Sequence, residues 1–198
     1  LSIYNQEGNA TDTISQPIYK EGAFVVADSS IHTSQIYDIR GNVTCDVDEL
    51  GNKTWYTYDE SGRLLSVKEN KGITSYAYST DTDGNSKVVT TYANGSTSTT
   101  LQDGAERTLY TSYSGSGKEI KTSYEYDEEG NLIKQIQSDK SYLSYTYDSQ
   151  NRLKELESYD ANGQIQHSTT YIYDNAGHVI GMSDQKGEHE QLSPLRYT

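Results

Sequence analysis

The chain is poor in most of the residues that build a compact globular core or a disulfide scaffold. Its 198 residues include one cysteine, two prolines, one methionine, one phenylalanine and one tryptophan. The single Cys45 excludes an internal disulfide. No run of 18 apolar residues and no signal-peptide core occur in the sequence, which therefore predicts no membrane insertion. The chain begins at Leu1, and we expect it to be a piece of a longer protein.

Basic residues are also scarce. Lys and Arg together number 16 against 29 Asp and Glu, so the formal net charge is −13, and no Lys/Arg cluster is present. Proteins that bind nucleic acid or anionic membranes carry a basic patch, because they must neutralise phosphates. The sequence therefore predicts no nucleic-acid partner.

Tyrosine is the abundant residue, with 19 copies in a chain whose hydrophobic content is only 32%. Globular domains usually reach about 45–50% apolar residues. A tyrosine ring suits a surface that is half covered and half wet, because its hydroxyl still needs a hydrogen-bond partner. We therefore expect a thin sheet rather than a thick globule.

A short motif recurs six times: Tyr-Asp, two variable residues, Gly or Asn, one variable residue and then an aliphatic residue. The six copies are Tyr37-Asp38 with Gly41 and Val43, Tyr58-Asp59 with Gly62 and Leu64, Tyr126-Asp127 with Gly130 and Leu132, Tyr147-Asp148 with Asn151 and Leu153, Tyr159-Asp160 with Gly163 and Ile165, and Tyr173-Asp174 with Gly177 and Val179. Asn151 is the one replacement of Gly. Asn also enters the left-handed backbone region readily, so it suits the same position.

The motif predicts a β-hairpin. Asp at the first turn position accepts hydrogen bonds from nearby backbone N–H groups, and Gly or Asn takes positive φ as a bulge. A second tyrosine stands two residues before the first in several copies, which is the period of a strand. These tyrosines are Tyr56, Tyr124, Tyr145 and Tyr171, and the pair Tyr76 and Tyr78 repeats the spacing without the Asp.

Further turn residues fill the gaps between the motifs at intervals of 9 to 14 residues. The full series of expected turn markers is Gly41, Gly51, Gly62, Gly72, Gly84, Gly95, Gly104, Gly117, Gly130, Lys140, Asn151, Gly163, Gly177 and Gly187. Alternate turns of a meander share one edge of the sheet, and all motif turns except the one at Gly163 occupy alternate places in this series.

This spacing predicts an all-β fold: a long antiparallel meander of about 12–16 short strands in a twisted or coiled ribbon. Residues 36–190 form the expected hairpin ribbon, residues 1–35 a less regular β segment, and residues 191–198 a tail. Within the first segment, Ile18-Tyr19 and Phe24-Val25-Val26, separated by Gly22, are candidates for two further strands.

The six motifs resemble the YD repeats of the Rhs family, which includes bacterial Rhs proteins, the C components of Tc toxins, wall-associated proteins and teneurins. The resemblance covers residues 36–187. It implies a long β-ribbon that spirals into a hollow shell, which in relatives encloses a toxin or supports cell-surface contact. The sequence shows no core-associated segment with the family's Asp-Pro signature, since neither Pro17 nor Pro194 follows an Asp, and it shows no aspartyl self-cleavage site and no variable toxin tail. We therefore expect a repeat segment alone, secreted or at the bacterial cell surface.

Residues for catalysis or metal binding do not converge in the sequence. His32, His167, His178 and His189 are scattered without metal-ligand spacing, and Cys45 has no His near it in sequence. The segment from Ser79 to Asn85 only faintly resembles a calcium loop, because Thr90 stands where the closing acid belongs. We predict no enzyme activity, no cofactor and no metal site.

Two functions fit these features. In the first, the chain is a structural repeat segment of a larger secreted or cell-surface protein, with the rest of that polypeptide as its partner. The alternative is a carbohydrate- or cell-wall-binding module that uses exposed tyrosines. A protein ligand, or a homodimer formed through one sheet face, is a further option.

Overall fold

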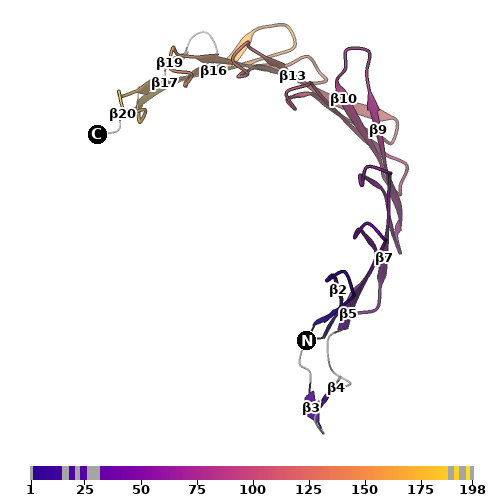
Figure 1. Cartoon of the computed structure of the whole chain (residues 1–198). Helices are drawn as coiled ribbons and strands as arrows, with labels where there is room; N and C mark the ends of the chain where they lie inside the picture. The colour runs from indigo at the N-terminus through magenta and orange to yellow at the C-terminus, as the bar shows by residue number, and fades with distance from the viewer. Residues whose placement is uncertain are drawn as a thin grey trace. The chain divides into compact units, whose positions relative to one another are not determined.

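The computed structural model describes residues 2–14, 18–20, 23–25, 32–186, 190–191 and 195–196. These residues form strands and turns, and none of them lies in a helix (Figure 1). The described part of the chain accordingly holds no helix that is long and apolar enough to cross a membrane. The all-β prediction is confirmed.

The first strands are β1 (Ser2–Tyr4), β2 (Ala10–Ile14), β3 (Ile18–Lys20), β4 (Ala23–Val25), β5 (His32–Tyr37), β6 (Val43–Val47), β7 (Lys53–Tyr58), β8 (Leu64–Glu69), β9 (Gly72–Thr80) and β10 (Ser86–Thr91). The remaining strands are β11 (Thr97–Gln102), β12 (Thr108–Gly115), β13 (Lys118–Tyr126), β14 (Leu132–Ile136), β15 (Tyr142–Tyr147), β16 (Leu153–Tyr159), β17 (Ile165–Tyr173), β18 (Val179–Lys186), β19 (Glu190–Gln191) and β20 (Leu195–Arg196). The fourteen strands from β5 to β18 fall inside the predicted number.

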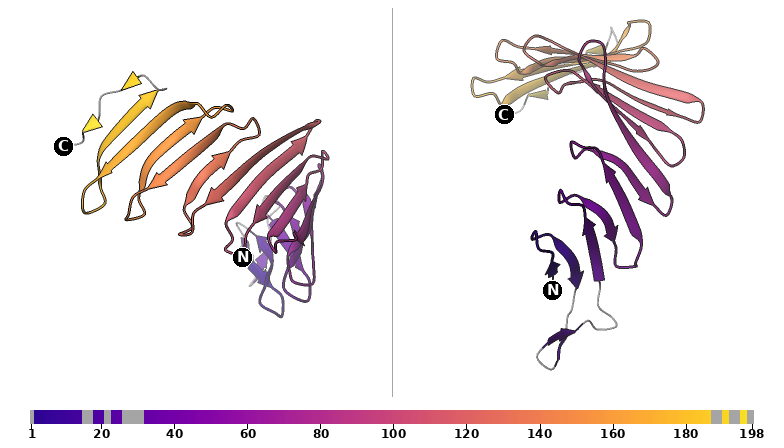
Figure 2. Two further views of the ribbon diagram at one scale, coloured as in Figure 1. Left: turned by 90° about the horizontal axis from the view of Figure 1, so that it is seen from above. Right: turned by 45° about the vertical axis from the view of Figure 1, so that its right-hand side comes forward.

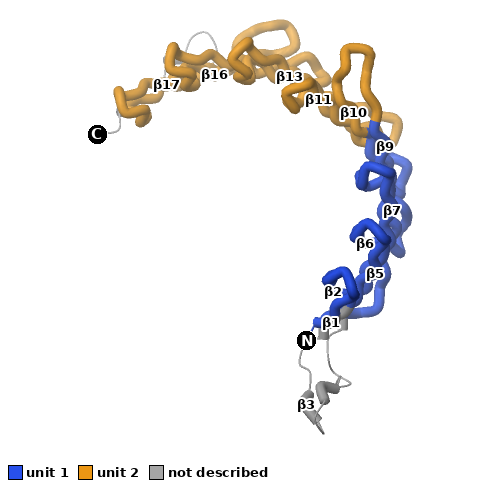
Figure 3. The backbone as a smooth tube through the Cα atoms, in the orientation of Figure 1, with its two compact units in different colours: residues 1–78, 89–97 blue, residues 79–88, 98–198 orange. Residues whose placement is uncertain are grey.

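The chain divides into two compact units (Figure 3): residues 1–78 with 89–97, and residues 79–88 with 98–198. In unit 1, antiparallel pairing runs from β1 to β2, then to β5 through β9 in sequence order. In unit 2 it runs from β12 to β18 in sequence order. The strands of unit 2 lie side by side in a single layer (Figure 2, left). The division of the chain at residues 35 and 190 stays a prediction.

Residues 2–14 contain two strands that the sequence did not predict. Strands β1 and β2 form a hairpin around a turn from Asn5 to Asn9, with Gly8 at φ +84°. The two candidate strands near Ile18 and Phe24 are present as β3 and β4, which form a separate two-stranded sheet. Gly22 and Val26 lie outside the described residues, as does the expected turn marker Gly187.

Each motif turn has the same backbone geometry. In the first motif, Asp38 N–H donates to the Asn42 carbonyl at 2.9 Å, and Gly41 N–H donates to the Asp38 carbonyl at 3.1 Å. The strand register shifts by one residue at the motif tyrosine, as between Ile36 and Tyr37. The turn and bulge together twist the hairpin and fix its register.

Positive φ falls on most of the expected turn markers, including the non-glycine residues Lys140 (φ 71°) and Asn151 (φ 64°). The marker at Gly104 is wrong. In that turn, Glu106 takes positive φ (62°), and its N–H donates to the Asp103 carbonyl. The turn begins at Asp103, as an Asp begins the motif turns, so counting from the Asp rather than from the Gly gives the bulge position.

Very little of the sheet is fully buried, as expected for a single layer. Cys45 and Leu101 are the buried hydrophobic residues among those described. Tyr37, Tyr56 and Tyr58 in unit 1 are only half-buried. Stability must therefore come from many partly covered contacts rather than from one deep core.

Gly130→Val is expected to lower the free energy of unfolding by about 1–2 kcal/mol, because Gly130 has φ +91° and a β-branched residue is strained there. Thermal or urea unfolding checks this. Gly104→Val is the matched control, because Gly104 lacks positive φ and has open space at its Cβ position. Equal losses for both variants would contradict the argument.

Candidate functional site

The side chains of the motif converge on one edge of the sheet in each unit. Successive hairpins place the turns at Gly41 and Gly62 on the same edge of unit 1, with the turn at Gly51 on the other. In unit 2, the turns at Gly130, Asn151 and Gly177 share an edge, and the turn at Gly163 lies opposite. We call the edge that carries most motifs the motif edge.

The Asp that begins the motif turn uses both carboxylate oxygens in every copy except that at Asp160, where only Oδ1 accepts hydrogen bonds. Oδ1 of Asp148 accepts the N–H groups of Gln150 (2.9 Å) and Arg152 (3.0 Å), and its Oδ2 contacts the Arg152 guanidinium at 2.7 Å. Asp38 makes the same set of contacts, with the Asn42 side-chain amide in place of Arg152. The carboxylate therefore fixes the turn from inside, as in an Asx-turn.

These hydrogen bonds favour the ionised carboxylate. The Arg152 side chain and its backbone N–H hold the pKa of Asp148 below its ordinary value. The pKa of Asp38 is lowered in the same direction, chiefly by the hydrogen bond from the Asn42 side chain. At Asp174 the backbone N–H of His178 contributes most.

The motif tyrosines form a second repeated contact, which joins one hairpin to the next. In five of the six motifs, and at Tyr78, the hydroxyl donates to the backbone carbonyl of the first strand residue after the preceding turn on the motif edge, at 2.7–2.9 Å. We call this set of contacts the tyrosine ladder. Its members are Tyr37 to Ala10, Tyr58 to Val43, Tyr78 to Leu64, Tyr126 to Thr108, Tyr147 to Leu132, and Tyr173 to Leu153.

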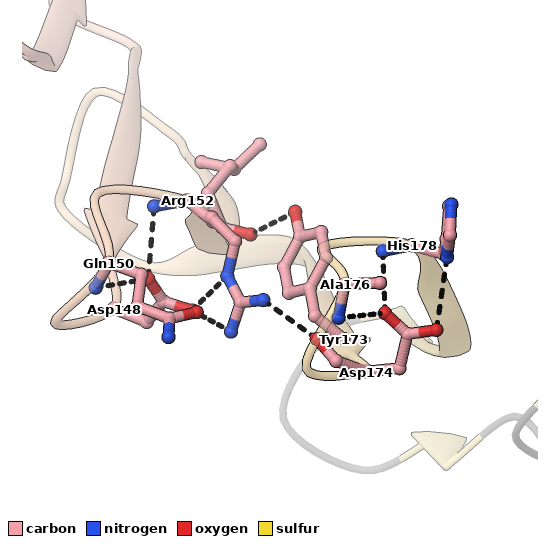
Figure 4. A network of polar contacts seen from close by, with 8 residues as sticks. Asp148, Gln150, Arg152, Tyr173, Asp174, Ala176 and His178 are labelled. Atoms are coloured by element: carbon pink, nitrogen blue, oxygen red, sulfur yellow. Dashed lines mark hydrogen bonds and ion pairs between the residues drawn. The ribbon is translucent and has the colours of Figure 1, made fainter.

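Arginine at the last turn position adds a third contact in some hairpins (Figure 4). Arg152 binds Asp148 in its own turn, and its guanidinium lies 4.5 Å from the centre of the Tyr173 ring in the next hairpin. It also donates to the Asp174 carbonyl at 3.0 Å. Cation–π contacts of this kind contribute about 0.5–1 kcal/mol at exposed sites.

The same arrangement recurs in both units. Arg63 lies over Tyr78, and Arg107 lies over Tyr126. Neither Tyr78 nor these arginines belong to the predicted site residues. Tyr78 was missed because two residues separate it from Asp81, whereas Tyr and Asp are adjacent in the motif. Each arginine stands four residues after a turn Asp, and this spacing could have identified the arginines from the sequence.

Tyr159 departs from the ladder. Its motif turn at Gly163 lies on the opposite edge, and its side chain faces the opposite side of the sheet from Tyr147 and Tyr173. The ring stacks on Tyr142 with centroids 4.4 Å apart, and the hydroxyl donates to Glu157 at 2.6 Å. That hydrogen bond, together with burial, raises the pKa of Tyr159 to about 12.

The tyrosines two residues before the motif tyrosines lie on the same face of the sheet as the ladder, but their hydroxyls do not join one hairpin to the next. Tyr56, Tyr124, Tyr145 and Tyr171 are half-buried, and within the described residues their hydroxyls have no hydrogen-bond partner in the protein. Burial raises the pKa of Tyr56 and of Tyr145.

The aliphatic positions Leu64, Leu132 and Leu153 supply the carbonyls that the ladder hydroxyls bind.

Groups that support catalysis or metal binding do not gather in the described residues. No cluster of three or more His, Cys, Asp or Glu side chains suited to a metal ion occurs among them. Cys45 is buried, His167 contacts Asp184 at 2.9 Å, and His178 binds its own turn Asp at 3.1 Å. The backbone of His32 lies in β5, and His189 falls outside the described part.

The loop that faintly resembles a calcium site is an ordinary member of the turn series. Oδ1 of Asp81 accepts the N–H groups of Asp83 and Asn85, and its Oδ2 accepts the Asn85 side-chain amide. The same oxygens would be needed to bind a cation.

Comparison with known proteins agrees with this geometry. A family model described as Teneurin YD-shell matches residues 11–192, and the chain belongs to this family. The Rhs/YD-repeat resemblance is therefore confirmed. A search of curated proteins finds no match.

Among solved structures, the chain is similar to the TcdB2-TccC3 crystal structure without the hypervariable C-terminal region. Sequence identity is 16% and the TM-score 0.70, over 98% of this chain and 11% of that one. A TcdB2-TccC3-Cdc42 structure matches at 15% identity with TM-score 0.45, over 91% and 12% of the two chains. The Photorhabdus luminescens Tc holotoxin pore matches at 16% identity with TM-score 0.28, over 100% and 14%. The present chain thus spans about a tenth of the length of the first structure, which shows the fold alone.

Tyr147→Phe is expected to lower the free energy of unfolding by about 1 kcal/mol, because it removes the hydroxyl donated to the Leu132 carbonyl while keeping the ring. Chemical denaturation monitored by circular dichroism measures the loss. Tyr145→Phe is the control on the same strand, since the Tyr145 hydroxyl has no protein partner. A loss at Tyr145 as large as that at Tyr147 would contradict a specific role for the ladder.

Acid should destabilise the chain through its turn carboxylates. The pKa of Asp148 in the folded chain lies below the ordinary 3.8, so its stabilising contribution is complete above that value and is lost as pH falls through the lowered pKa. Melting temperatures should stay level from about pH 7 to 5 and fall below about pH 4. Asp148→Asn should melt lower at neutral pH and show a shallower acid dependence. An unchanged acid profile in this variant would count against the turn carboxylate.

Proposed function

We propose that this chain is a non-catalytic structural segment of a larger secreted or cell-surface protein, and that it forms part of a β-shell. The observation that carries the proposal is the tyrosine ladder, which uses the repeated side chains to join hairpins. The family match and the similarity to Tc-toxin shells in fold support this assignment. Extracellular location and the enclosing of a toxin or effector by the complete shell belong to the proposal.

The hydrogen bonds of the motif also bear on the carbohydrate-binding alternative. Sugar sites present aromatic rings with open faces and polar groups ready to bind hydroxyls. The ladder tyrosines are half-buried, and their hydroxyls are already bound to backbone carbonyls. Arginine guanidinium groups cover the rings of Tyr78, Tyr126 and Tyr173. The repeat therefore favours the structural role.

A glycan array probed with the purified chain tests the choice between these functions. The structural role predicts no glycan-specific signal, together with a fall in melting temperature when ladder residues Tyr126 and Tyr147 are both changed to Phe. Tyr92 and Tyr113, which are 40% and 45% exposed, provide the matched binding variants. A specific glycan signal that Tyr92→Ala or Tyr113→Ala abolishes would overturn the structural assignment.

A further inference from the structure

Unit 1 carries a row of apolar side chains on the face opposite its tyrosine ladder. Cross-strand pairing connects Ile36 to Cys45, Cys45 to Trp55, Trp55 to Lys68 and Lys68 to Ile73. Because directly paired residues point to the same side of a sheet, these five residues form one stripe across β5 to β9. We call it the Trp55 stripe.

The Trp55 stripe is buried at Cys45 and exposed at its other members. Cys45 is fully buried, whereas Ile36, Trp55 and Ile73 are 53%, 44% and 48% exposed. No second layer within the described residues of unit 1 covers this face (Figure 3). Several exposed apolar side chains on one face, with a tryptophan among them, are typical of a protein–protein contact rather than of a solvated face.

Trp55 also lines a groove of about 350 Å³ with a distinct charge pattern. Lys53 and Lys68 line the groove and lie on the same face as the indole, and Glu69 also lines it. The Asn70 side chain donates to the Asn52 side chain at 3.2 Å and so ties together the turns at one end of the groove. The groove therefore pairs an apolar ring with two ammonium groups, in a chain whose net charge is −13.

We propose that the Trp55 stripe binds an acidic peptide segment of another protein, with apolar side chains on the stripe and carboxylates beside Lys53 and Lys68. The stripe crosses four strand intervals, or about 19 Å, which an extended peptide of about six residues spans. Charge complementarity selects the acidic partner, because the two lysines attract carboxylates that the rest of the surface repels.

The same charges disfavour a second copy of this chain as the occupant. A two-fold dimer brings identical patches together, so Lys53 and Lys68 of one copy would face the same lysines of the other. The net charge of −13 on each copy adds a long-range repulsion. An acidic peptide segment of another protein avoids the repulsion between the lysines of two identical patches.

The single tryptophan of the chain makes the site its own reporter. Synthetic peptides of about ten residues that alternate Glu with Leu, Lys with Leu, or Ser with Leu are titrated into the protein at neutral pH. The Glu-Leu peptide is expected to shift Trp55 emission to the blue and to bind more weakly as salt rises. The Lys-Leu and Ser-Leu peptides are expected to leave the emission unchanged.

Charge reversal supplies the decisive variants. Lys53→Glu with Lys68→Glu should weaken binding of the Glu-Leu peptide by about tenfold or more. The control, Lys118→Glu with Lys154→Glu, makes the same charge change at exposed lysines of unit 2 and should stay within about twofold. Trp55→Ala, followed by anisotropy of labelled peptide, should also weaken binding.

Several results would overturn the proposal. These are equal binding of all three peptides, equal effects of the two charge-reversed variants, and an emission change that sedimentation shows to accompany self-association. Thermal unfolding of each variant confirms that it is folded before binding is compared. None of these outcomes depends on the tyrosine ladder, so failure here leaves the proposed shell function intact.

Discussion

The hydrogen bond from a motif tyrosine to a backbone carbonyl of the preceding hairpin is the interaction on which the rest of each unit depends. Neighbouring strands are already joined by the backbone ladder, which any sequence can form. The tyrosine reaches beyond its own hairpin, as when Tyr147 binds the Leu132 carbonyl. This side-chain hydrogen bond therefore fixes the position of one hairpin relative to the next. A sheet with almost no buried core thereby acquires a defined register.

The turn and the ladder depend on each other. The Asp carboxylate and the residue at positive φ fix where the second strand starts, and the carbonyl of that first residue is the acceptor for the next tyrosine. Where the last turn residue is Arg, as at Arg152, one side chain contacts both the turn Asp and the incoming ring. Local turn chemistry and longer-range packing are thus specified by the same few positions, which is the consistency expected of a sequence that folds to one state.

Much of this arrangement can be predicted from the sequence, because the signals are local and repeated. Tyr-Asp spacing, strand alternation and the choice of Gly or Asn at the bulge predict the antiparallel fold and the exceptional edge of the Gly163 turn. The hydroxyl acceptors cannot be predicted in this way, since no pattern says that Tyr58 reaches Val43 rather than a neighbour. The shift of the bulge from Gly104 to Glu106 was also missed, because glycine is only one of the residues that tolerate positive φ. Trp55 has no repeat at all, so its place beside Cys45 and Lys68 emerges only from strand register.

The reversed orientation of Tyr159 has a consequence for how such chains change length. Tyr126 and Tyr147 are 21 residues apart and lie on one edge, whereas Tyr147 and Tyr159 are 12 apart and lie on opposite edges and faces. Gain or loss of a whole strand pair leaves every later motif in phase with its neighbours. Gain or loss of a single strand transfers all later motifs to the other edge. A change of length that keeps the tyrosine ladder on one edge of this sheet must therefore involve an even number of strands, a parity rule imposed by the reach of one phenol group.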